Sequence, residues 1–220
     1  MTQRNLLKLK SLIICVAFVI SGCGKQLSNA EDRAMVIDSV NTFTLDFYHK
    51  LAKFQQTEEN GNIICSPLSV SAVLSMVYAG AHGKTADEIE KALYSETLKE
   101  RAHPAFHDIL KKMTDGSDYE LYLANQVWVP NGTNLNERYI DINRRYYGSS
   151  PREIDFAGGK AGNVVADWIR KETHGRIKNT SIPEINEQTN LLLTSVIYFK
   201  GTWVNQFDPE KTEEDRRRRS

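Results

Sequence analysis

Residues 62–83, NIICSPLSVSAVLSMVYAGAHG, predict a helix that is apolar on almost every side. Ser66 is a typical N-cap residue, and Pro67 suits the first helical position because its ring already fixes a helical φ. Residues 68–79 then carry apolar or small side chains around the whole circumference, until Gly80 and Gly83 end the helix. A helix without a polar face must be buried inside a domain. We therefore expect the fold to be built around this segment.

Amphipathic helices are expected on both sides of this buried segment, because apolar residues recur there at three- and four-residue steps. Their ranges are 32–54, 84–93, 100–113, 136–148 and 161–175, with Gly175 as a C-terminal cap. The second of these helices opens with a capping box formed by Thr85 and Glu88. Short strands are expected at 63–65 and 151–156.

Two longer strands are expected at the centre of a sheet. Residues 191–199, LLLTSVIYF, are apolar almost throughout, as expected of a strand that is covered on both faces. Residues 119–130 instead alternate between two faces. One face carries Leu121, Leu123, Asn125, Val127 and Val129, and the other carries Tyr122, Ala124, Gln126 and Trp128. Because no repeat or low-complexity linker separates these elements, we expect one α+β domain over residues 32–215.

The N-terminus resembles a bacterial lipoprotein signal. A basic start, MTQRNLLKLK, precedes the mainly apolar SLIICVAFVI, which is too short to span a bilayer as a helix. The sequence Ile20-Ser21-Gly22-Cys23 then matches a lipobox, in which residues 1–22 are removed and Cys23 is lipidated; an ordinary secretory signal is the alternative. Residues 23–31 would form a polar tether. Gly24 after the cysteine favours delivery to the outer membrane or cell surface.

Cysteine and charge usage restrict the possible chemistry. If Cys15 leaves with the signal and Cys23 carries lipid, Cys65 has no disulfide partner within the chain, and we expect it to be a buried, inert thiol. Positive charge is concentrated in the signal and in the four arginines of 216–219, so the body between them is mildly acidic and nucleic acid is not an expected partner. The arginine run either binds anionic lipid or is a solvated end.

Candidate catalytic residues do not form a consistent set. His103 and His107 have the spacing of a metal pair on a helix, but no third ligand is placed, and solvated surface histidines are the preferred interpretation. The serines around Ser66 lack the G-x-S-x-G pattern of a nucleophile elbow. Glu153 and Asp155 share one strand face, which is more typical of a solvated surface than of an acid pair. We expect no enzymatic activity, metal or cofactor.

Taken in chain order, these segments resemble the serpin family. NIICSPLSVSAVLSMVYAGAHGKTADEIEKAL resembles the family's first buried strand, core helix and following small helix. LANQVWVPNGTNLNERYIDINRRYYGSSPREIDF resembles two strands of the large sheet and the helix between them. VVADWIRKETHGRIKN resembles the helix across that sheet, and LLLTSVIYFKGTWVNQFDPEKTEE resembles its third strand and the segment leaving it.

The resemblance implies a large mixed sheet and suicide inhibition of serine, sometimes cysteine, proteases. A protease cleaves a bait loop, and the loop inserts as a new strand into the large sheet. In this chain the sheet would open beside 191–199, with Ser66 and Ser69 beneath the opening point and Trp203 near the top of the gap. Ser195 stands where the family usually has an asparagine. Since serine has one donor where an amide has two, the contact over Ser66 and Ser69 should be altered.

The resemblance covers residues 41–214, little more than the first half of the family domain. We therefore expect an N-terminal portion, truncated before the reactive-centre loop, in which 216–220 is an aberrant basic tail. The predicted function is serine protease inhibition by the full-length family member, with this fragment incomplete and inactive because it holds no reactive bond. A non-inhibitory, surface-anchored binding or scaffold protein is the alternative. An exposed apolar edge at 191–199 also predicts instability or self-association.

Overall fold

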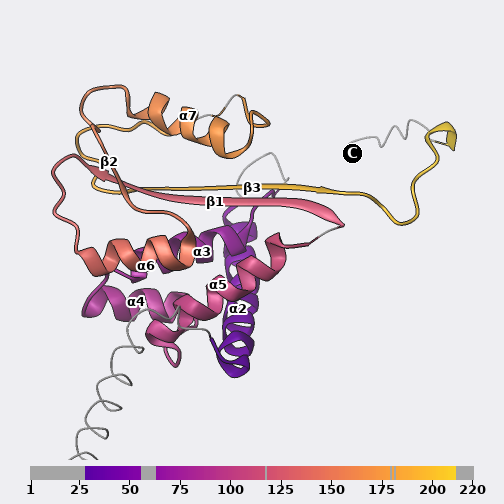
Figure 1. Ribbon diagram of the computed structural model, residues 1–220, viewed down its shortest axis with the longest axis horizontal. Coiled ribbons are helices and arrows are strands. Elements are labelled where there is room, and N and C mark those ends of the chain that lie inside the picture. Colours follow the sequence, from indigo (N-terminus) through magenta and orange to yellow (C-terminus); the bar gives the residue numbers. More distant parts are fainter. Residues whose placement is uncertain (1–27, 56–62, 117, 179, 181, 212–220) are drawn as a thin grey trace, which may run out of the picture.

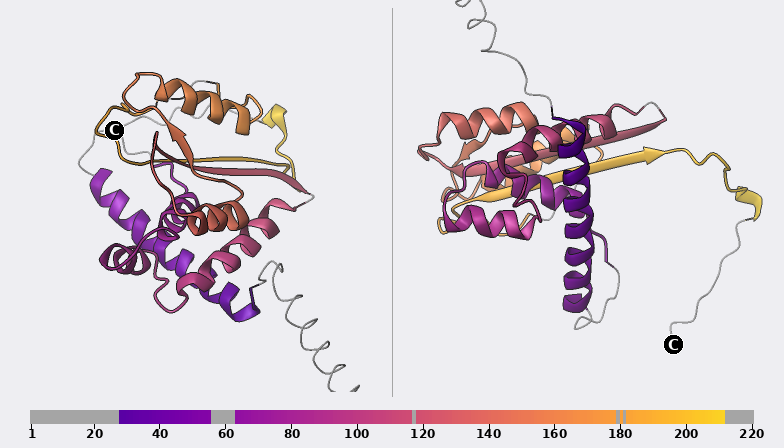
Figure 2. Two further views of the ribbon diagram at one scale, coloured as in Figure 1. Left: turned by 60° about the vertical axis from the view of Figure 1, so that its left-hand side comes forward. Right: turned by 90° about the horizontal axis from the view of Figure 1, so that it is seen from below.

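The computed structural model describes residues 28–55, 63–116, 118–178, 180 and 182–211 of the 220-residue chain. Within them a sheet separates two layers of helices (Figure 1). The helix labelled α7 lies on one face of the sheet, and α2 to α6 lie on the other. The left view of Figure 2 shows the same layering from another side. The α+β class expected from the sequence is confirmed.

The helices follow the ranges expected from the apolar periodicity to within a few residues. They are α2 Ala30–Gln55, α3 Pro67–Tyr78, α4 Lys84–Ala92, α5 Ala102–Thr114, α6 Glu137–Tyr147 and α7 Ala161–Glu172, with single 3-10 turns η2 Lys99–Arg101 and η3 Pro209–Lys211. Gly175 follows α7 with φ +76, and its N–H donates to the Arg170 carbonyl at 2.8 Å, so it helps to end the helix as predicted. No described helix combines the length and the apolar character needed to cross a membrane.

The strands β1 Tyr119–Pro130, β2 Arg152–Ile154 and β3 Leu192–Gly201 form the sheet in the order β2-β1-β3. β1 runs parallel to β2 and antiparallel to β3, with Asn125 opposite Ser195 and Trp128 opposite Leu192. The two predicted faces of β1 are confirmed. Val127 and Val129 pack on the helical layer below, whereas Trp128 packs beneath α7.

Each face of the sheet has its own apolar core. The core shared with α2, α3, α5 and α6 buries Val36, Ala72, Val73, Met76, Leu98, Ala105, Phe106, Val127, Val129, Tyr146 and Tyr147. The core beneath α7 buries Trp128, Ile154, Phe156, Ala161, Val165, Trp168 and Ile169. Burial of this much apolar surface on both faces stabilises β1 as the central strand of the sheet.

The start of α4 differs from the sequence prediction. Gly83 is the N-cap residue, with φ +56 and no side-chain cap hydrogen bond, so the predicted cap at Thr85 is wrong. Glycine reaches this left-handed conformation without the steric cost of a Cβ. The helix therefore begins at Lys84, and Thr85 is already inside its first turn.

The expectations for residues 63–65 and for full burial of β3 are also wrong. Residues 63–66 are not a strand, Ile64 is 99% exposed, and Cys65 is exposed rather than buried. No strand in the described part of the chain pairs with this segment, and only Ile63 among its apolar side chains is partly covered. β3 is half-buried at its start, but its end extends past the helices, and Phe199 is 65% exposed.

Candidate functional site

The N-terminus of α3 places two serines below the sheet. Ser66 caps the helix by accepting a hydrogen bond from the Ser69 N–H at 3.4 Å, and the two hydroxyl oxygens lie 3.0 Å apart. Ser69 is buried and Ser66 is half-buried. The helix packs against both β1 and β3, so these serines lie at the base of the strand pair. Ser66 and Ser69 therefore contact each other, and their role beneath an opening sheet stays a prediction.

Ser195 belongs to a different contact. Its hydroxyl donates to Asn125 Oδ1 across the β1–β3 pair at 2.6 Å, and Asn125 is almost fully buried. The structure records no hydrogen bond from Ser195 to Ser66 or Ser69. Asn125 was visible in the sequence only as a polar residue on an apolar strand face, and its partner could not be read from the alternation. The oxygen of this buried amide thus has its partner on the strand beside it.

The outer edge of β3 is the feature of the described chain that is best suited to bind another segment of polypeptide. β3 pairs with β1 along Leu192–Gly201 on one side, and it has no strand partner on the other side among the described residues. An unpaired edge presents a row of N–H and C=O groups that can pair with one more strand. The apolar side chains of Ile197 and Phe199 on this strand are 41% and 65% exposed.

Trp203 lies beyond the end of β3 and is 71% exposed. Its ring contacts Phe207 edge-on, with ring centroids 5.9 Å apart. Val204 between them is 99% exposed. Trp203 therefore lies two residues beyond β3, in an aromatic pair that was not predicted from the sequence.

Beneath α7 the strand pair is held by a buried tryptophan. Trp128 Nε1 donates to Thr194 Oγ1 on β3 at 2.9 Å, which satisfies its only polar atom. Its ring meets Trp168 of α7 edge-on, with centroids 5.8 Å apart. This single side chain connects β1, β3 and α7, so it couples the covering helix to both strands.

A second contact between α7 and the sheet comes from the residues that follow the helix. The Arg176 guanidinium lies over the Tyr198 ring of β3, 4.6 Å from its centroid, and 3.6 Å from Glu120 Oε2 of β1. His174 packs against Tyr122 of β1 at 5.1 Å between ring centroids. We call this group the Arg176 clasp (His174, Arg176, Glu120, Tyr122 and Tyr198). It was not predicted from the sequence. The sequence indicated it only through two tyrosines, Tyr122 near the start of β1 and Tyr198 near the end of β3.

The proposed metal pair on α5 is not a surface feature. His103 is buried with Nδ1 2.7 Å from the Tyr147 hydroxyl oxygen, so the expectation of a solvated histidine is wrong for this residue. His107 Nδ1 lies 3.0 Å from the Tyr146 carbonyl oxygen. Within the described ranges, no group of three or more His, Cys, Asp or Glu side chains has the arrangement of a metal site.

The carboxylates at 153 and 155 have structural partners. Glu153 Oε2 accepts from the Gly132 N–H at 2.8 Å, which ties β2 to the turn after β1. Asp155 Oδ1 accepts from the N–H groups of Ala157 and Gly158 at 3.0 Å each. Each carboxylate therefore holds a turn, and they do not act as a pair.

Some predicted sites fall outside the described residues. These are the signal at 1–22, the lipidated Cys23 and the basic tail at 216–220. The predicted tether at 23–31 is described only from Ser28 onward. Within this part of the predicted tether, Ser28 is buried. Helix α2 begins at Ala30, two residues before the expected start of the domain.

The fold and the site together define a class of protein. A mixed sheet that offers a free strand edge, with a buried helix beneath it and another helix across its opposite face, suits a protein that takes up an additional strand. The family model described as serpin (serine protease inhibitor) matches residues 38–217. This chain belongs to the serpin family.

Individual relatives agree with the family assignment. The chain is 33% identical over 181 residues to an uncharacterized serpin-like protein of Thermococcus kodakarensis, covering 80% of this chain and 41% of that protein. It is 31% identical over 179 residues to neuroserpin of Gallus gallus, covering 80% of this chain and 43% of neuroserpin. It thus spans about half the length of the relatives it matches.

Two solved structures have the same fold. Ovalbumin from emu superimposes with a TM-score of 0.72 at 29% identity, covering 82% of this chain and 50% of ovalbumin. Serpin48 of the insect Tenebrio molitor superimposes with a TM-score of 0.73 at 28% identity, covering 84% of this chain and 50% of Serpin48. The serpin fold inferred from the sequence is confirmed.

Proposed function

We propose that the whole protein, of which this chain supplies the part that resembles the first half of a serpin, inhibits serine proteases, and some cysteine proteases, by taking a cleaved loop as a new strand beside β3. The observation that carries this proposal is the open outer edge of β3 along Leu192–Gly201. A strand that adds there gains a complete row of main-chain hydrogen bonds. The family to which the chain belongs is described as serine protease inhibitors, which supports the same activity.

The residues around the edge have distinct roles in this proposal. α3, capped by Ser66, supports the strand pair from below, and the Ser195–Asn125 hydrogen bond holds β3 to β1 while the outer edge stays free. Trp128 and Thr194 join the same two strands beneath α7. β3 can therefore pair with a new strand at its outer edge while it remains paired with β1.

The covalent step belongs to the protease. Its catalytic serine or cysteine attacks a peptide bond of the bait loop, forms an ester or thioester with the carbonyl carbon and releases the amine of the following residue. Insertion of the freed loop beside β3 would then carry the acylated protease along with the loop. We assign the reactive bond to no residue of this chain.

The lipobox adds a location to the proposal. We propose that Cys23 carries a lipid anchor and that the protein acts at the outer membrane or cell surface, where it meets extracellular proteases. Each buried lipid CH₂ contributes about 0.8 kcal/mol, so several acyl chains would hold it durably. Replacement of Cys23 by serine is expected to move the protein from the membrane fraction to the soluble fraction.

The activity is tested with the protein isolated from its own membrane. We expect incubation with a panel of serine and cysteine proteases to produce a complex that survives denaturing electrophoresis. The same protease, first inactivated at its nucleophile, should form none, because the acyl bond cannot form. Degradation of the protein by every protease, with undiminished protease activity, would refute inhibition.

That negative outcome would favour a second function. Phe199, Trp203 and Phe207 are all largely exposed, and clustered exposed aromatic side chains are typical of protein interaction surfaces. A non-inhibitory binding or scaffold protein would use this surface instead of strand insertion. A protein partner should then compete with modification of Trp203, whereas protease inhibition would be absent.

A further inference from the structure

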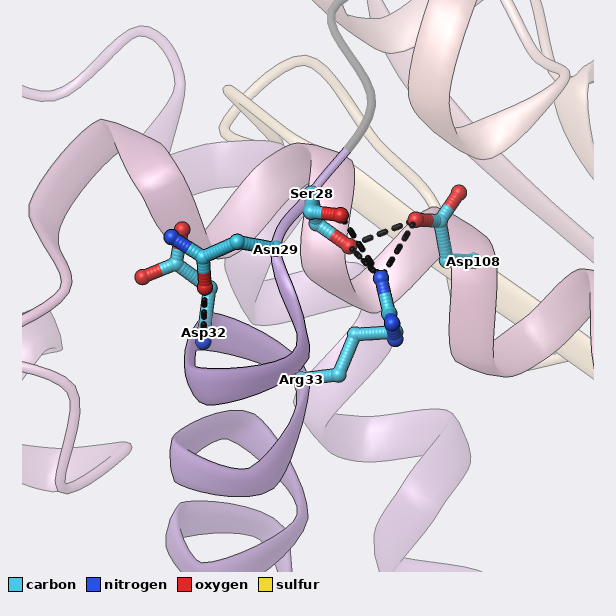
Figure 3. Close-up of polar contacts among 5 residues, drawn as sticks. All are labelled: Ser28, Asn29, Asp32, Arg33 and Asp108. Atoms are coloured by element: carbon cyan, nitrogen blue, oxygen red, sulfur yellow. Dashed lines mark hydrogen bonds and ion pairs between the residues drawn. The ribbon is translucent and has the colours of Figure 1, made fainter.

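The start of the described chain is tied down by a polar network around Ser28 (Figure 3). The Ser28 hydroxyl donates to Asp108 Oδ2 of α5 at 2.5 Å, and Arg33 Nη1 donates to the Ser28 carbonyl oxygen at 2.6 Å. The same guanidinium nitrogen lies 3.6 Å from Asp108. Asn29 Oδ1 accepts from the Asp32 N–H at 2.7 Å, which caps α2. The chain therefore leaves the domain from one fixed point.

This point lies on the side of the molecule that is remote from the sheet. Figure 1 shows α2 beginning at the end of the helical layer that is farthest from the sheet and running toward the sheet, and the left view of Figure 2 shows the same direction. α7 and the open edge of β3 lie beyond that layer. We call the network around Ser28, together with the start of α2, the Ser28 corner (residues 28–34 and Asp108).

The distance available between the corner and a lipid anchor is short. Cys23 precedes Ser28 by five residues. A fully extended chain of that length spans at most about 18 Å. α2 alone has 26 residues, which is about 39 Å of helix. A tether shorter than this helix cannot pass around the domain and bring the sheet against the bilayer.

The charges of the corner are compatible with a lipid surface. Arg33 is paired with Asp108, and Arg101 Nη1 lies 2.5 Å from Asp32 Oδ1. These opposite charges compensate each other in pairs, so exposed Glu31 leaves the first turn of α2 with a single negative charge. Anchoring then depends on the acyl chains and not on the charge of the lipid headgroups.

We propose that the Ser28 corner is the membrane-facing surface of the protein and that the sheet faces away from the bilayer. The proposal rests on the lipid anchor at Cys23 suggested above. The partner is a lipid bilayer, and the consequence is that β3 and α7 point toward soluble partners. The Ser28 network acts as an orienting device, since it stops the tether from lengthening by unravelling the start of α2.

Fluorescence quenching from the membrane tests this orientation. The lipidated full chain is placed in vesicles of phosphatidylethanolamine and phosphatidylglycerol that contain a nitroxide headgroup lipid. In a Cys65→Ser background, one fluorophore is attached through Ala34→Cys or through Lys53→Cys, both at exposed positions of α2. The two positions are about 28 Å apart along the helix axis. We expect several-fold stronger quenching at position 34 than at position 53.

A longer tether is the matched control. Insertion of about ten Gly and Ser residues before Ser28 gives a flexible chain that no longer restrains the domain, and the difference between the two positions should disappear. Flotation with the vesicles is measured in the same samples, with Cys23→Ser as reference. Flotation with equal quenching at both positions, or with stronger quenching at position 53, overturns the orientation alone. Failure to float overturns both the anchor and the orientation.

Discussion

His103 lies in the interior between α3, α5 and α6. Its Nδ1 is 2.7 Å from the Tyr147 hydroxyl oxygen, and its ring lies against Tyr78 and Tyr146. Burial, and to a smaller extent the positive charge of Arg138, lowers the pKa of His103 from 6.5 to about 4. The imidazole is therefore neutral at physiological pH, although the sequence placed it on an ordinary helix surface.

The lowered pKa of His103 predicts that the protein loses stability in mild acid. As the pH falls from 6.5 toward 4, the unfolded chain binds a proton at this position and the folded chain does not, so the free energy of unfolding decreases. A shift of this size corresponds to roughly 3 kcal/mol in total. Urea midpoints at several pH values in this interval measure the effect. His103→Gln should flatten the curve, and an unchanged slope would contradict the assignment.

The serines of the candidate site differ in how far along the chain their hydrogen-bond partners lie. Ser66 caps α3 as its position before proline predicts, because capping is a local interaction. Ser195 instead donates to Asn125, which is 70 residues away in the sequence. That partner depends on the register of β1 against β3, which no single strand contains. The sequence could therefore place Ser66 and Ser69 together but not Ser195.

At the scale of elements, the segment after α7 is held to both strands by the Arg176 clasp. Arg176 lies over Tyr198 of β3 and near Glu120 of β1, so it bridges the pair that carries the open edge. The side chain is about half exposed, and solvent screens its ion pair. The planar contact with the tyrosine ring is then the main stabilising interaction.

Loss of that planar contact should loosen the segment without unfolding the helix. Arg176→Lys keeps the charge but cannot stack in the same way. We expect amide hydrogen exchange in residues 173–178 to become faster by up to about fivefold, as a loss of 0.5–1 kcal/mol implies. Arg170→Lys, on α7 and paired with exposed Asp167, is the matched control. Equal changes in the two variants would show that the ring contact has no such role.

At the scale of the whole molecule, the helices cover the start of β3 but leave its end exposed. The start of β3 is half-buried between α3 and the α7 side, whereas Ile197 and Phe199 near its end are exposed. An apolar strand edge of this kind promotes pairing between molecules. An exposed apolar edge was predicted for 191–199, and the arrangement of the layers decides that the exposed side chains are those near the end of the strand.

A single charge on this strand should reduce self-association. Lysine at an exposed strand position opposes edge-to-edge pairing, so Phe199→Lys should shift the protein toward the monomer in sedimentation velocity. Val204→Lys adds the same charge outside the strand, at a fully exposed position, and should have little effect. If the unmodified protein is a monomer that unfolds cooperatively at all concentrations tested, the edge is not a site of self-association.

The sequence by itself determined the approximate ranges of the helices and of the three strands of the sheet, and the two faces of β1. These features follow from periodicity within one segment, and the apolar circumference of α3 is the clearest case. The tertiary structure alone decided that Cys65 is exposed, that His103 is buried beside Tyr147, and that Arg176 reaches both strands. Burial and partners depend on what packs from distant parts of the chain, which local periodicity does not encode.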